Sequence, residues 1–230
     1  MSITNDKIKN MKRIITAVVF AGMLISCNST NNTKNTKQET SDTDVTTLKK
    51  PLKEIDTDEA LIATALMAAP EESRAEAKVI GYNMAGEFVT FREGSNEFIV
   101  LVDNPKQDGF NAACYHKNLE PFMARGRALR AEGKNMQEVF AIREAEMKSG
   151  KLNIPSGSTL HIYFGKNTTY DPETSKVDGA KLRYVVYMPW ATSASTGLPK
   201  SPIAPNHPWI MNPGTHRAHI MISPLSLEKE

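Results

Sequence analysis

The sequence lacks the short motifs that mark several common classes of enzyme. It contains no Gly-x-Ser-x-Gly elbow, no glycine-rich loop ending in Gly-Lys-Ser/Thr, no His-Glu-x-x-His and no Cys-x-x-Cys. Each of these motifs places a nucleophile, a phosphate, a zinc ion or a redox pair through its spacing. The sequence therefore gives no support to serine hydrolase, nucleotide-binding, zinc peptidase or thioredoxin-like chemistry.

An apolar run long enough to cross a membrane is also missing from the amino-terminal region. The run at residues 14–25 is shorter than the about 20 residues that a spanning helix needs. It follows Lys12 and Arg13 and ends in Leu24-Ile25-Ser26-Cys27. A basic region, a short apolar core and a small residue before the cleavage site are typical of a secretory signal. We therefore assign residues 1–26 as a signal peptide.

The end of this segment, Leu24-Ile25-Ser26-Cys27, resembles the lipobox of bacterial lipoproteins. The resemblance implies that Cys27 is the lipidation site and carries acyl chains such as palmitate. Several acyl chains on one residue hold a protein on a lipid bilayer without any spanning helix. Because Asn28 rather than Asp follows Cys27, the resemblance implies an envelope protein of the outer membrane that faces the periplasm.

An excess of positive charge disappears when the signal is removed. The full chain has 28 basic and 26 acidic residues, which gives a formal net charge of +2. Residues 1–26 hold four of the basic residues and one of the acidic ones, so the remaining chain has a net charge of −1. No basic stripe interleaved with aromatic residues remains, and we predict no nucleic-acid partner.

Cysteine is scarce, with two residues in the whole chain. If Cys27 is acylated, Cys114 has no partner for an internal disulfide. We interpret Cys114 as a small buried hydrophobic residue. The alternative is a reactive nucleophile with His116, two residues away, as the neighbour that stabilises its thiolate.

The remaining chain divides into a polar segment and one domain. Residues 27–50 begin with Cys27 and then contain Val45 and Leu48 as their only apolar residues, which predicts a flexible tether. Residues 51–230 have the length of a single globular domain.

The periodicity of residues 51–230 alternates between helical and strand-like. Helical spacing predicts helices at residues 58–67, 118–131 and 135–150, and alternation predicts strands at residues 78–83, 87–93, 97–103, 159–164, 181–188 and 217–223. Asn135 and Glu138 form a capping box, and the buried stripe of that helix is expected at Met136, Val139, Phe140 and Met147. The first three strands are expected to form a meander, and residues 189–213 a proline-rich loop. We predict an α+β fold, with a mostly antiparallel sheet of about six strands and helices packed on one face.

Polar side chains recur on one side of the last three predicted strands. Alternation separates His161 and Tyr163 from their apolar neighbours, and it does the same for Arg183 and Tyr187 and for Arg217 and His219. If the strands are neighbours, these six residues share a face. Arg183, Tyr187 and Arg217 would then bind an anionic or polar ligand, and His161, Tyr163 and His219 are the candidate catalytic residues of an enzyme. The alternative is a polar outer face of the sheet.

Histidine spacing offers a weaker hypothesis of a metal site. His216 and His219 would be the ligands, with His161 or His207 completing the set. Residues three apart point to opposite sides of a regular strand, so this spacing suits neither a strand nor a standard zinc motif. We therefore predict no cofactor.

The domain also resembles a group of exported bacterial proteins without assigned activity. The resemblance rests on Phe91-Arg92-Glu93-Gly94-Ser95-Asn96-Glu97-Phe98, Gly197-Leu198-Pro199 and the segment from Pro208 to Ile222. It implies a shared fold and no particular activity. Our hypothesis is a membrane-anchored envelope lipoprotein with a non-catalytic domain that binds a ligand or partner. The alternatives are a hydrolase-like envelope enzyme and a structural envelope protein with an exposed apolar patch around Trp190 and Trp209.

Overall fold

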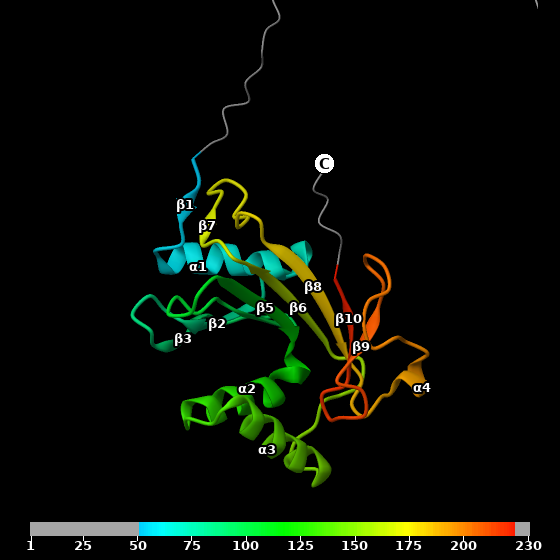
Figure 1. Cartoon of the computed structure of the whole chain (residues 1–230). Helices are drawn as coiled ribbons and strands as arrows, with labels where there is room; N and C mark the ends of the chain where they lie inside the picture. Colours follow the sequence, from blue (N-terminus) through cyan, green and yellow to red (C-terminus); the bar gives the residue numbers. More distant parts are fainter. Residues whose placement is uncertain (1–50, 224–230) are drawn as a thin grey trace, which may run out of the picture. The chain divides into compact units, whose positions relative to one another are not determined.

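The computed structural model describes residues 51–223. The signal peptide, Cys27, the tether at residues 27–50 and the segment 224–230 lie outside the described residues. The predictions for those segments therefore stay predictions. The described chain runs from β1 (Lys53–Glu54) to β10 (His219–Ile222) through short helices and strands (Figure 1).

A large sheet, eight-stranded within residues 51–223, forms the centre of the structure. Its strands lie in the order β3 (Phe88–Arg92), β2 (Lys78–Tyr82), β4 (Phe98–Leu101), β5 (Phe110–His116), β6 (Thr159–Gly165), β8 (Lys181–Tyr187), β10 and β9 (Trp209–Met211). All neighbours are antiparallel except β2 and β4, which are parallel. β1 pairs separately with β7 (Thr169–Tyr170). The predicted α+β class with a mostly antiparallel sheet is confirmed, and the sheet is larger than the expected six strands.

The predicted meander is wrong, because β2 lies between β3 and β4. The loop that joins β3 to β4 passes the start of β2, where the N–H groups of Ser95 and Asn96 donate to the carbonyl oxygen of Glu76. A Cβ atom at Gly94 would lie 2.2 Å from the backbone nitrogen of Lys78. Only glycine allows two backbones to approach this closely, so Gly94 permits the crossing.

Two strands of the large sheet were not predicted. β5 lies at its centre, but its residues 111–114 are Asn-Ala-Ala-Cys and lack the β-branched residues that mark a strand. β9 lies inside the predicted proline-rich loop, at the sheet edge where prolines before and after a short strand are tolerated.

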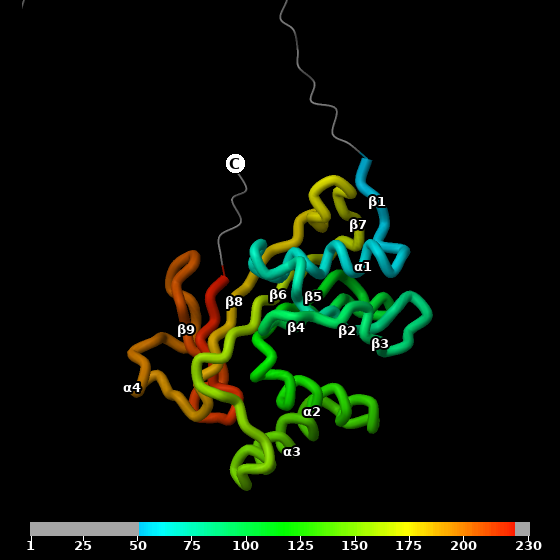
Figure 2. The backbone as a smooth tube through the Cα atoms, turned by 180° about the vertical axis from the view of Figure 1, so that it is seen from behind, coloured from blue at the N-terminus to red at the C-terminus, as the bar shows by residue number. Residues whose placement is uncertain are grey.

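Helices cover both faces of the sheet rather than the one expected. Helix α1 (Asp58–Ala65) and the 3-10 helices η1 (Leu66–Ala68) and η2 (Glu71–Ser73) lie on one face, which we call the α1 face. Helix η3 (Lys117–Leu119) and helices α2 (Glu120–Ala131) and α3 (Met136–Lys148) lie on the other, the α2–α3 face. Figures 1 and 2, which view the chain from opposite sides, both show this separation.

Each face has its own apolar core. On the α1 face, Leu61 and Ala65 of α1 pack with Val79, Val100 and Cys114 of the sheet. On the α2–α3 face, Leu119 and Phe122 pack with a group of strand residues, namely Ile80, Ile99, Tyr115, Leu160, Val185 and Tyr187. Alternate residues of the central strands therefore serve opposite cores, as the period of two requires.

Helix α3 begins as predicted but buries a different stripe. Asn135 accepts from the backbone N–H of Glu138, and the Glu138 side chain accepts from the N–H of Asn135, which confirms the capping box. Val139 is 3% exposed, but Met136 is 78% exposed, so the assignment of Met136 to the buried stripe is wrong. Arg143, one turn after Val139, is buried in its place.

Candidate functional site

The register of the strands separates the six polar residues that were expected to share a face. His161 lies opposite Tyr184, while Ile162 lies opposite Arg183. Because side chains directly opposite each other point to the same side, His161 and Arg183 face opposite cores. The expectation of one shared face is therefore wrong. Alternation along each strand was predicted correctly, but a register shift of one residue reverses the face of a whole strand.

Two groups result from this separation. His161 and Tyr163 belong to the α1 face, beside Leu182 and Tyr184. On the α2–α3 face, Tyr187 lies opposite His219, and Arg183 is on the same side of β8 as Tyr187. The candidate catalytic residues His161 and His219 thus have the sheet between them and do not act on one substrate atom.

Tyr163 is held in a structural role. Its ring is buried, and its hydroxyl oxygen accepts from the backbone N–H of Val177 at 2.9 Å while donating to the carbonyl of the same residue at 3.4 Å. Burial raises the pKa of Tyr163 above its ordinary value. The side chain therefore ties the loop after β7 to the sheet and presents no free hydroxyl to a substrate.

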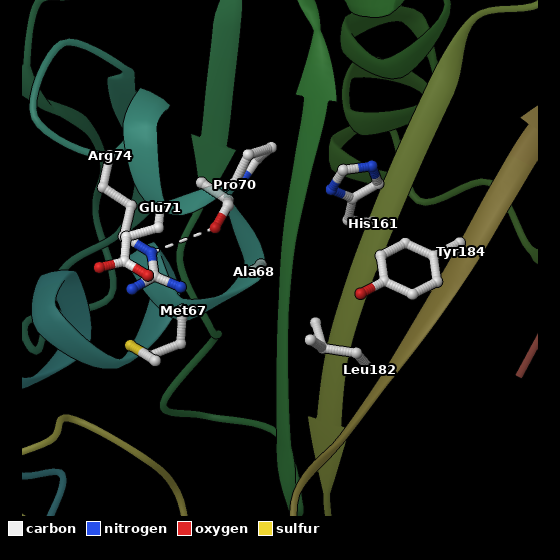
Figure 3. Close-up of a pocket in the computed structure, with 9 residues that line it drawn as sticks. Met67, Ala68, Pro70, Glu71, Arg74, His161, Leu182 and Tyr184 are labelled. Atoms are coloured by element: carbon white, nitrogen blue, oxygen red, sulfur yellow. Dashed lines mark hydrogen bonds between the residues drawn. The ribbon is translucent and has the colours of Figure 1, made fainter. Parts of the chain in front are cut away.

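A hollow of about 260 Å³ opens on the α1 face. One wall is formed by His161, Leu182 and Tyr184, and the other by the segment from η1 to Arg74, namely Met67, Ala68, Ala69, Pro70, Glu71 and Arg74. Figure 3 shows the strand residues facing this segment, with the imidazole of His161 beside the ring of Tyr184. The wall combines apolar surface with a few polar groups, which is the usual composition of a small-molecule site.

The polar groups of the hollow are neutral at its centre and charged at its rim. Burial lowers the pKa of His161, although the backbone of Ala68 favours its protonated form. The guanidinium Nε of Arg74 donates to the carbonyl oxygen of Ala69 at 3.1 Å, which keeps the positive charge beside Glu71 at the mouth. At neutral pH the hollow therefore offers a neutral imidazole, a phenol and an apolar wall.

A second group of polar residues lies between the sheet and helices α2 and α3. We call it the arginine cluster, and it consists of Arg143, Tyr187, His216, Arg217 and His219. Arg143 is 5% exposed, and its Cζ lies 3.9 Å from the centre of the Phe122 ring. Its Nη1 donates to the carbonyl oxygen of Phe122 at 3.3 Å. The guanidinium is thus clamped against helix α2.

His216 is enclosed by aromatic rings. It is 0% exposed, and the centres of the Phe140, Phe122 and Trp190 rings lie 4.6, 6.0 and 6.4 Å from that of its imidazole. Neither ring nitrogen has a hydrogen-bond partner among the residues described. Burial, and then the positive charge of Arg143, lower the pKa of His216 to about 4. The imidazole is therefore neutral at physiological pH.

His219 is also neutral, because burial outweighs the backbone carbonyl of Arg217, which favours its protonated form. Its Nδ1 lies 2.7 Å from the carbonyl oxygen of Arg217, so this nitrogen carries the proton and donates. Its ring lies 5.5 Å from that of Tyr187, and burial lowers its pKa. The arrangement fixes the tautomer of His219 and orients it toward Tyr187.

The metal hypothesis gains no set of ligands from the structure. His216 lies among aromatic rings, and His161 is on the other face of the sheet. Within residues 51–223 no group of three or more His, Cys, Asp or Glu side chains is arranged to hold a metal ion.

The structure also places Cys114 and the two tryptophans that were singled out in the sequence. Cys114 is 1% exposed in the core of the α1 face, and burial raises the pKa of its thiol to about 12, which favours the interpretation as a buried hydrophobic residue. Trp209 packs against the other core, while Trp190 is 40% exposed, with Lys148 Nζ 5.8 Å from its ring centre.

Arg143 is the member of the arginine cluster that sequence reasoning missed. Its signal was present, because residues 139, 143 and 147 continue one helical stripe and Arg143 interrupts the apolar residues of that stripe. Gly126, in the middle of α2, was the second signal: a Cβ atom there would lie 2.8 Å from Arg143 Nη1.

No helix among residues 51–223 combines the length and apolar character needed to cross a bilayer. Comparison of the chain with known protein families, curated proteins and solved structures finds no match.

Proposed function

We propose that the chain is a lipid-anchored lipoprotein of the bacterial cell envelope whose domain binds a small molecule without converting it. Cys27 is the proposed attachment point, at the outer membrane on its periplasmic side. The observation that carries the binding role is the hollow on the α1 face, in which His161 and Tyr184 lie beside an apolar wall. The bound molecule would have an apolar body and at least one hydrogen-bonding group, matching this wall.

A binding role explains the arrangement better than a catalytic one does. A general acid or base must lie within hydrogen-bond distance of the proton that it transfers, or reach it through one water. The candidate residues cannot act together on one substrate, since His161 and His219 face opposite cores and the Tyr163 hydroxyl is engaged by Val177.

The hollow is tested by analysing what the protein retains on purification. The full chain is purified from the envelope fraction, and the small molecules released by denaturation are identified by mass spectrometry. Leu182→Trp fills the hollow and is expected to abolish the retained molecule. Leu198→Trp, at a part-buried leucine outside the hollow, is the matched control and should retain it. An equal yield from both variants, or nothing retained by the unmodified chain, contradicts the binding role.

The anchor is tested separately. Metabolic labelling with a palmitate analogue should mark the chain and place it in the membrane fraction, and Cys27→Ser should abolish both. Labelling that persists in the Cys27→Ser variant rejects Cys27 as the attachment point.

A further inference from the structure

The arginine cluster places positive charge in the protein interior without matching negative charge. Arg143 is 5% exposed and Arg217 is half-buried, and in the part of the chain that the structure describes neither forms an ion pair with a carboxylate. The Nε atoms of both arginines are buried and lack a hydrogen-bond partner among the described residues. Buried charges are costly unless they are paired, so this arrangement calls for an anion.

The two arginines lie on different aromatic rings, and both of these rings surround the same histidine. Arg143 stacks on Phe122, and the Cζ atom of Arg217 lies 6.0 Å from the ring centre of Phe140. Both of these rings contact His216. Burial, and then the charge of Arg217, lower the pKa of Arg143 to about 10, and the smaller opposing effect of Glu146 does not cancel this. The two guanidinium groups therefore repel each other. An anion between them would remove this repulsion.

The nearby carboxylates of α3 are occupied by other cations. Glu146 accepts from Arg125 at 2.7 Å, and Glu144 pairs with Lys148 at 3.5 Å. The contact of Arg143 with the Phe122 ring offsets part of the cost of burying the charge, but an aromatic ring does not neutralise it. Among residues 51–223, the cluster therefore remains positively charged.

Helix α2 leaves space for the Arg143 side chain at Gly126. Gly126 is buried in the middle of this helix, where glycine is less favourable than alanine. A Cβ atom at residue 126 would lie 2.8 Å from Arg143 Nη1 and 3.4 Å from its Cζ. The sequence thus uses a weaker helix former where the guanidinium needs space, which is expected if the position of this arginine has a function.

We propose that Arg143 and Arg217, together with the hydroxyl of Tyr187, form a binding site for a phosphate group, either free or esterified to a small molecule. A phosphate carries between one and two negative charges at neutral pH, which matches two guanidinium groups. Guanidinium groups present several N–H donors that fit phosphate oxygens. Tyr187 lies at the end of β8 opposite His219, and its ring centre lies 5.9 Å from that of Phe122, on which Arg143 stacks.

This site lies on the opposite face of the sheet from the hollow, so it does not depend on the proposed function. The test uses the full chain in a non-ionic detergent, with sodium phosphate and glycerol 3-phosphate as probes and sodium chloride at the same ionic strength as the reference. Binding is measured by titration calorimetry, and the melting temperature is followed in parallel. We expect one phosphate group per chain and a higher melting temperature than in chloride.

The variants separate this site from a general affinity for anions. Arg143→Met and Arg217→Gln are each expected to weaken phosphate binding at least tenfold, and Arg143→Lys also weakens it because the planar fork is lost. Arg217 is half-buried, so its variant reports on binding if Arg143→Met fails to fold. Arg183→Gln is the matched control: Arg183 also stacks on one ring, Phe164, at 4.4 Å and has an unpartnered Nε, but no second arginine adjoins it in the contacts described.

The outcomes are decisive in both directions. Binding of inorganic phosphate, of glycerol 3-phosphate or of both supports the site, and the preferred probe shows whether free or esterified phosphate is its ligand. No effect beyond that of chloride, or an equal loss in Arg183→Gln and Arg217→Gln, overturns the proposal. Arg143 would then be a buried cation held by the ring and the carbonyl oxygen of Phe122. Leu182→Trp should leave phosphate binding unchanged, so failure of this proposal is distinguishable from failure of the hollow.

Discussion

Gly126→Ala is expected to destabilise the protein, although the same change in the interior of most helices is stabilising. Alanine is favoured over glycine in a helix by about 1 kcal/mol. At residue 126, however, the new Cβ would lie 2.8 Å from Arg143 Nη1. Arg143 is 5% exposed and has little room to move, so its guanidinium must leave the position it occupies against α2.

The magnitude follows from the contacts that Arg143 would lose. A desolvated cation–π contact contributes up to about 2 kcal/mol, and the hydrogen bond from a charged group to the carbonyl of Phe122 about 1.5–3 kcal/mol. Partial loss of both outweighs the gain of about 1 kcal/mol in helix propensity. We expect the free energy of unfolding to fall by about 1–2 kcal/mol.

Guanidinium chloride unfolding, followed by far-UV circular dichroism, measures this change in a double-mutant cycle. In an Arg143→Met background the clash with the guanidinium is absent, and Gly126→Ala should then stabilise by about 0.5–1 kcal/mol. The change of sign between the two backgrounds is the expected result. If Gly126→Ala stabilises the unmodified protein, or has the same effect in both backgrounds, Arg143 is not clamped as described.

Three further predictions concern buried groups. Tyr163→Phe leaves the N–H of Val177 without its partner at 2.9 Å and should lower the free energy of unfolding by about 1–3 kcal/mol in urea, whereas an unchanged midpoint would mean that water replaces the bond. The pKa of His216 is lowered from 6.5 to about 4, so the unfolded chain binds the proton first and stability falls as the pH drops through this window. The loss attributable to His216 is about 2 kcal/mol between pH 7 and pH 5, and His216→Leu should remove it in unfolding measured at both values. The buried thiol of Cys114, with its pKa raised to about 12, should react with iodoacetamide at pH 8 only after unfolding; rapid alkylation of the folded chain would show an accessible thiolate.

Local sequence patterns were sufficient for most of the elements and for the fold class. The capping box of Asn135 and Glu138 marked the start of α3, and helical spacing marked α1. Alternation assigned His161 and Leu160 to opposite sides of β6 without any knowledge of its neighbours. These features depend on residues a few positions apart, and their physical causes are backbone hydrogen bonding and the helical and strand periods. The central strand β5 was missed because Ala112 and Ala113 carry no local strand signal.

Only the tertiary structure decided which side chains meet. The pairing of His161 with Tyr184 rather than with Arg183 depends on the register between β6 and β8, which is set by hydrogen bonds between distant segments and by two separate cores. That register divided one expected face into the hollow around His161 and the arginine cluster around Arg217. The sequence by itself determined most of the elements, the α+β class and the capped start of α3. The fold decided that Arg143 lies against Phe122, near Arg217 and without a carboxylate among the described residues, because contacts across the sheet and between helices are not encoded in any single segment.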